Sequence, residues 1–134
     1  VEGGRMTSSR ERGSVTALVL GLVATFVVCA GLVVDGGRVV SAYLTVADIA
    51  ENAARSGTQE LQSLRSGHPK LEPQRAARAA ERYLRSAGVS GKVSFQGNII
   101  IVTADRSVSF SLLRLIGLMG TRVSAVRHAE PMTQ

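Results

Sequence analysis

Aromatic side chains are scarce in this sequence. Tryptophan is absent, and two tyrosines and three phenylalanines make up 4% of the 134 residues. Aromatic rings form the cages that hold quaternary ammonium ligands and the platforms on which nucleic-acid bases stack. The composition therefore offers little material for either kind of site.

Cysteine is almost as rare, because Cys29 is the only one. A single cysteine excludes an internal disulfide. Since Cys29 lies within a long apolar segment, we interpret it as a small residue among lipids or helices. Lipidation at Cys29 is a weaker alternative, because the preceding Phe26, Val27 and Val28 poorly match the small residues that a lipoprotein signal requires.

Motifs for catalysis and metal binding are also missing. His68 and His128 have no cysteine, histidine or carboxylate neighbours at metal-ligand spacing. The sequence contains neither a G-x-S-x-G nucleophile elbow nor a phosphate-binding loop with its lysine. We therefore predict a protein that is not an enzyme and has no catalytic residues, no metal, no cofactor and no small-molecule substrate.

The positive charge is not concentrated in runs. The net charge is +6, and residues 35–134 carry 13 basic and 8 acidic side chains along their whole length. Nucleic-acid-binding segments show basic runs or basic residues interleaved with aromatics, and neither occurs here. We expect no nucleic-acid partner, and anionic lipid headgroups or envelope polymers are the better match for this charge.

The dominant feature that is present is an uncharged segment of 21 residues, Ser14 to Val34. As a helix it would be about 31 Å long, the thickness of a bilayer's hydrocarbon core. It is longer than the apolar region of a cleaved signal peptide, and no A-x-A sequence follows it. We therefore predict a transmembrane helix that stays in the bilayer.

The orientation of this helix follows from the basic residues beside it. Three arginines (Arg5, Arg10 and Arg12) precede the segment, whereas the 20 residues after it contain only Arg38. We expect a single-pass protein of the cell membrane, with a cytoplasmic N-terminus and an extracytoplasmic C-terminal domain.

Small residues recur within the apolar segment. Gly13, Ala17 and Gly21 are spaced four residues apart, an arrangement that lets another helix approach closely. The ordinary frequency of glycine and alanine in membrane helices explains this spacing equally well. Asp35, Gly36 and Gly37 follow the segment and predict a hinge at the membrane exit, either a kink or a local melting of the helix, because consecutive glycines weaken a helix.

Helical periodicity resumes after the hinge, in a seam that runs from Val39 to Leu64 in steps of three and four. The middle of this seam is thin because Ala50, Ala53 and Gly57 carry almost no side chain. Such a stripe suits close packing against a neighbouring helix or against the chain's own small domain.

The rest of the chain predicts one helix and a small sheet. Glu72 to Ala87 reads as a helix that Gly88 caps, and four of its arginines form one basic face. Gly97-Asn98 separates two β-prone segments as a hairpin turn would. An apolar turn over 112–119, closed by Gly120, precedes a third strand at 121–129 with Val123 and Ala125 on one face. The basic face consists of Arg75, Arg78, Arg82 and Arg85.

These elements predict an α+β fold in five segments. They are a cytoplasmic basic leader that we expect to be disordered (1–13), a transmembrane helix (14–34), an extension helix (35–66), a small extracytoplasmic domain with an antiparallel sheet (67–130) and a disordered tail (131–134).

Three blocks of the sequence carry a family resemblance: Arg12 to Thr16, Val33 to Arg38 and Ala47 to Leu61. In this order the chain resembles the TadE/TadG family of Flp (tight-adherence) pilus assembly proteins in its actinobacterial form. The resemblance implies a minor pilin or pseudopilin that supports assembly of a thin filament. Its implied partners are the bilayer and other pilus membrane proteins or pilins, contacted through helix packing.

The resemblance also implies a processing site between Gly13 and Ser14. Processed pilins have glycine before the cleaved bond and glutamate at the fifth residue after it, and here that residue is Leu18. The substitution favours an uncleaved accessory protein over a processed subunit. A membrane-anchored module that binds envelope polymers or anionic lipid through the arginine face is the alternative function.

Overall fold

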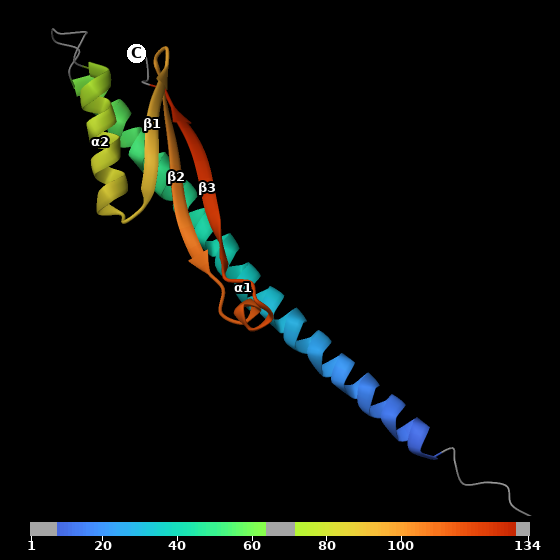
Figure 1. Cartoon of the computed structure of the whole chain (residues 1–134). Coiled ribbons are helices and arrows are strands. Elements are labelled where there is room, and N and C mark those ends of the chain that lie inside the picture. The colour runs from blue at the N-terminus through green and yellow to red at the C-terminus, as the bar shows by residue number, and fades with distance from the viewer. Residues whose placement is uncertain (1–7, 64–71, 131–134) are drawn as a thin grey trace, which may run out of the picture. The chain divides into compact units, whose positions relative to one another are not determined.

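A computed structural model describes residues 8–63 and 72–130 of the chain (Figure 1). The described residues form an α+β structure with two α-helices, one short 3₁₀ helix and three strands. Their order is α1 (Ser8–Ser63), α2 (Glu72–Ser86), β1 (Ser90–Gln96), β2 (Ile99–Ser109), the 3₁₀ helix η1 (Leu113–Ile116) and β3 (Gly120–Ala129). The predicted fold class is confirmed at this level.

The described residues divide into two compact units. The helix–loop unit consists of α1 up to Gly37 together with the β2–β3 loop, Phe110–Met119. The sheet unit consists of Arg38–Ser109 and the chain from Gly120 onward.

Helix α1 is 56 residues long and continuous. It begins at Ser8, so residues 8–13 are helical and the prediction of a disordered leader is wrong for them. Extending an existing helix by one residue costs little compared with nucleating a new one, which explains the earlier start. The rest of the leader, the predicted end of the extension helix at residues 64–66 and the tail from residue 131 lie outside the described residues.

The predicted local melting at Asp35, Gly36 and Gly37 is also wrong, because all three residues are helical. Each helical glycine costs about 1 kcal/mol, whereas interrupting the helix would require a second nucleation on the far side. A bend at these glycines stays a prediction.

The sheet is antiparallel, with strand order β1-β2-β3. The tight β1–β2 turn has a positive φ of 61° at Gly97 and none at Asn98, as a type II′ hairpin requires. Helix α2 ends at Ser86, one residue before the predicted Ala87. Gly88 caps it as predicted, since Gly88 has a φ of 66° and the N–H of Val89 bonds to the carbonyl of Leu84. The apolar turn differs from its prediction, because Gly117 caps it and Gly120 already belongs to β3.

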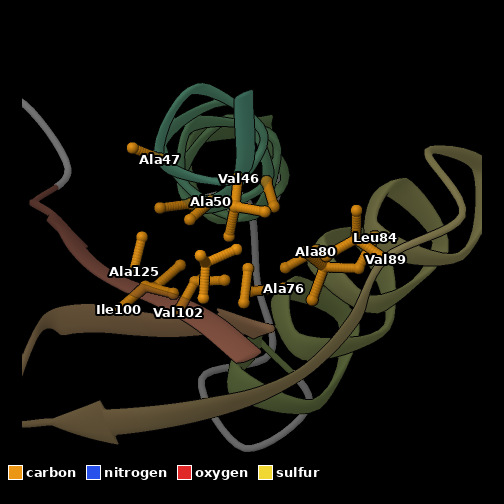
Figure 2. Packing of buried hydrophobic residues seen from close by; sticks show 14 residues of the cluster. Val46, Ala47, Ala50, Ala76, Ala80, Leu84, Val89, Ile100, Val102 and Ala125 are labelled. Atoms are coloured by element: carbon orange, nitrogen blue, oxygen red, sulfur yellow. The ribbon is translucent and has the colours of Figure 1, made fainter. Parts of the chain in front are cut away.

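The core of the sheet unit lies where α1 and α2 meet the sheet (Figure 2). Val46 and Ala50 of α1 point toward Ile100 and Val102 of β2, and α2 contributes alanines and Leu84. Val123 and Ala125 of β3 are buried together, as the strand period predicts. Eight of the 14 core residues are alanines, so the helices lie close to the sheet and few large side chains fill the interior.

Candidate functional site

The most unusual side chain of the helix–loop unit is Asp35, which is fully buried although it carries a carboxyl group. Its Oδ1 atom accepts a hydrogen bond of 2.8 Å from the backbone N–H of Ser111. Its Oδ2 atom accepts two more, each of 2.8 Å, from the N–H groups of Leu112 and Leu113. A buried carboxylate is tolerated when such donors replace its water, and charge-assisted bonds of this kind are the strong ones.

The β2–β3 loop has a shape that presents these three N–H groups together. Its ends are joined by a hydrogen bond from the N–H of Phe110 to the carbonyl of Met119. Between them η1 is ended by Gly117, whose φ of 91° is accessible mainly to glycine. The first N–H groups of any helix have no partner within it, and here Asp35 supplies one from a distant part of the chain.

A second contact holds the loop one turn earlier on α1. A Cβ atom built at Gly31 would lie 3.1 Å from Cδ2 of Leu113 and 3.4 Å from Cβ of Leu112. Leu113 is buried, at 6% exposure. The absence of a side chain at Gly31 therefore makes room for the loop against the last apolar turn of the predicted span.

The outer part of the loop is apolar and exposed. Leu115 and Met119 have exposed fractions of 75% and 71%. Ile116 and Leu118 are also exposed, and Arg114 lies exposed among them.

The residues predicted for helix packing fall into two groups. Gly13, Ala17 and Gly21 are on the exposed part of α1, and a side chain at Gly21 would meet nothing within 4 Å. The predicted processing residues Gly13 and Ser14 are exposed as well. This end of α1 offers a free surface in the helix–loop unit.

Ala50, Ala53 and Gly57, by contrast, are buried in the sheet unit. A Cβ atom at Gly57 would lie 2.9 Å from Cδ1 of Ile100 and 3.2 Å from the carbonyl oxygen of Ala76. Of the two roles open to the thin seam, the structure shows packing against the chain's own domain. These three residues are therefore not available to a partner helix.

The four arginines of the predicted basic face, Arg75, Arg78, Arg82 and Arg85, are all exposed on α2. The opposite side of α2 is buried through Ala76, Ala80 and Leu84. Helix α2 thus presents a cationic surface while its small apolar side chains pack on the sheet.

The described residues contain no group of three or more histidine, cysteine or acidic side chains that could hold a metal ion. The sheet unit has a surface hollow of about 460 Å³ beside α1 and the end of β3. Within it Glu51 is ion-paired with Arg55, one helical turn away. Thr58, Gln59, His128, Ala129 and Glu130 complete its lining.

The contact between Asp35 and the loop is not predicted by any local pattern, because its donors lie 76 to 78 residues away. Two signals point toward it. One is a lone carboxylate directly after 21 uncharged residues, since an ionisable group at such a position needs a partner. The other is the apolar run at 112–119, in which Arg114 is the one polar side chain.

Among the described residues, α1 is the one helix long and apolar enough to cross a membrane. Comparison of the chain with protein-family models, with curated protein sequences and with solved structures gives no match.

Proposed function

We propose that this chain is a non-enzymatic, single-pass membrane component of Flp-type pilus assembly that resembles a minor pilin or pseudopilin. The observation that carries the proposal is that the two parts of α1 have different surroundings. Its first part is apolar and exposed, and its second part is the core helix of a small α+β unit. In the proposed orientation the N-terminus is cytoplasmic and the sheet unit is outside the cell.

The blocks that carry the family resemblance support this proposal by their positions. The block from Val33 to Arg38 contains Asp35, whose carboxylate anchors the β2–β3 loop. The block from Ala47 to Leu61 contains the small residues that allow α1 to approach the sheet. Both blocks coincide with positions where the fold restricts the choice of residue.

The proposed partner surface is the row of small residues Gly13, Ala17 and Gly21. Small residues at this spacing allow two membrane helices to pack with their backbones close together. The row is exposed, so association with another pilus membrane protein would not compete with the core of the sheet unit.

The test is co-purification of the full chain with the other pilus membrane proteins from native membranes. Gly21→Leu should reduce the amount recovered, because the new side chain fills the space that a second helix would occupy. Ala30→Leu is the matched control, since it enlarges a small exposed residue on the opposite side of α1. Equal recovery with both variants would reject this surface as the interface.

Processing between Gly13 and Ser14 is tested by intact mass spectrometry of the protein extracted from native membranes. A mass that begins at Ser14 would identify a processed subunit. A mass that retains the residues before Ser14 would identify a permanently anchored accessory protein, the version that Leu18 favours.

The exposed arginine face of α2 favours one second candidate, a module that binds anionic lipid or envelope polymers. Reversing Arg78 and Arg82 to glutamate should then abolish binding of the full chain to anionic polymers. The full chain is needed because α1 supplies Val46 and Ala50 to the core on which α2 packs. A wild-type chain that does not bind such polymers would eliminate this candidate.

A further inference from the structure

The exposed apolar side chains of the β2–β3 loop require a neighbour. Leu115, Ile116, Leu118 and Met119 lie within ten residues and are all about half exposed or more. Exposed apolar clusters of this kind are typical of protein contacts or membrane contacts. The position of the loop within its own unit decides between them.

The loop lies beside the end of the apolar segment of α1. Leu112 and Leu113 pack at Gly31, four residues before Asp35. Four helical residues span about 6 Å, so this contact lies one turn on the apolar side of the charged boundary. If residues 14–34 span the bilayer, Leu113 is at the depth of the outer acyl chains.

The apolar surface of the loop adds to an apolar surface that already exists in the same unit. Leu32, Val33 and Val34 form the last turn of the apolar segment and are exposed as well. Lipid that surrounds these residues would also meet the side chains of the loop. Arg114 provides the one cationic side chain of the loop, which can reach a lipid phosphate while its neighbours stay in the apolar layer.

The backbone of the loop is also suited to a region with little water. Polar backbone groups in hydrocarbon must find partners within the protein. Seven of the ten loop residues have their N–H groups bonded within the unit. They are Phe110, Ser111, Leu112, Leu113, Leu115, Gly117 and Leu118.

We infer that the β2–β3 loop is a second membrane-contacting element, which inserts its apolar side chains into the outer leaflet beside α1. Asp35 holds the loop in place at the membrane boundary, and Arg114 binds lipid phosphate. The partner is the bilayer itself. This inference rests on the membrane anchoring that the proposed function includes.

The test uses the full chain in phosphatidylcholine–phosphatidylglycerol vesicles, with Cys29→Ala to remove the native thiol. Single cysteines at Leu115 and Met119 carry an environment-sensitive fluorophore. Nitroxide lipids, labelled near the headgroup or deep in the acyl chain, report depth, and aqueous iodide reports water access. Leu22→Cys in the apolar segment and the exposed Ser94→Cys in β1 are the controls.

We expect labels at Leu115 and Met119 to be quenched by the shallow nitroxide and protected from iodide, with blue-shifted emission. The label at Leu22 should be quenched by the deep nitroxide, and the label at Ser94 by iodide alone. The pattern should not change when the protein is diluted with lipid.

Two results would overturn the inference while leaving the anchor intact. One is iodide quenching at Leu115 and Met119 equal to that at Ser94. The other is protection from both quenchers that disappears on dilution with lipid, which would assign the loop to a contact between two copies of the chain. Iodide access at Leu22 would instead reject the membrane anchoring itself, and with it the proposed function.

Discussion

At the scale of single residues, Asp35 shows how an acidic side chain at the end of a long apolar segment can hold a loop that is distant in the sequence. It satisfies three N–H groups with two oxygens, at 2.8 Å in each case. Neither glutamate nor asparagine is equivalent, because glutamate is longer by one carbon and asparagine replaces an acceptor with a donor. The arrangement therefore depends on the charge and on the length of this side chain.

Asp35→Asn should loosen the β2–β3 loop. Hydrogen bonds to charged groups contribute about 1.5–3 kcal/mol, so the amides of residues 111–113 should exchange with deuterium about ten- to a hundredfold faster. Asp48→Asn is the matched control, because Asp48 is exposed on the same helix. Unchanged exchange at residues 111–113 in Asp35→Asn would show that the carboxylate does not hold the loop.

At the scale of the element, α1 contains glycines with opposite roles. Gly57 lies in tight surroundings, since the carbonyl oxygen of Ala76 lies 3.2 Å from where a Cβ would stand. At Gly37 a side chain would meet nothing within 4 Å. The sequence pattern separates these two glycines, with Gly57 in the thin seam and Gly37 at the expected hinge, and the structure adds that Gly57 lies in the core of the sheet unit.

The pair Gly57→Ala and Gly37→Ala tests this difference. Alanine adds about 1 kcal/mol of helix stability at either position, while overpacking at Gly57 costs about 1–3 kcal/mol. We expect Gly37→Ala to stabilise α1 and Gly57→Ala to lower the thermal stability of the sheet unit, as followed by circular dichroism in detergent. Equal stability of the two variants would contradict the close approach of α1 to β2.

The elements themselves were largely predictable from local patterns. Helix α2, the hairpin at Gly97-Asn98 and the buried face of β3 follow from capping, turn chemistry and strand alternation. Two features of the structure differ from what local patterns in the sequence predict, because cooperative or long-range effects determine them. The helix continues through Gly36 and Gly37 because both sides of it are already helical, and the tether at Asp35 depends on residues that follow it by more than 70 positions.

At the scale of the whole molecule, the two units differ in what stabilises them. The sheet unit has an interior of mostly alanine, and its largest fully buried side chains include Ile100, Val46 and Val102. Alanine contributes little apolar area, so these few larger residues carry most of the hydrophobic stabilisation. The helix–loop unit exposes its large apolar residues and contains the Asp35 bonds.

Ile100→Ala should therefore destabilise the sheet unit by about 2–5 kcal/mol. Ile116→Ala is the matched control in the exposed loop and should change stability by no more than about 0.5 kcal/mol. Tyrosine fluorescence during urea unfolding is a selective probe, because both tyrosines, Tyr43 and Tyr83, belong to the sheet unit. A similar midpoint for the two variants would contradict the assignment of Ile100 to the core.

The bond between Asp35 and Ser111 also sets an order of events during synthesis. The ribosome adds Ser111 76 residues after Asp35, which takes about 4–15 s at usual elongation rates. During that interval the carboxylate lacks the three N–H donors of the loop. If residues 14–34 span the bilayer as proposed, the cost of moving this carboxylate into hydrocarbon would limit how far the helix can slide, and arrival of the loop would then fix its depth.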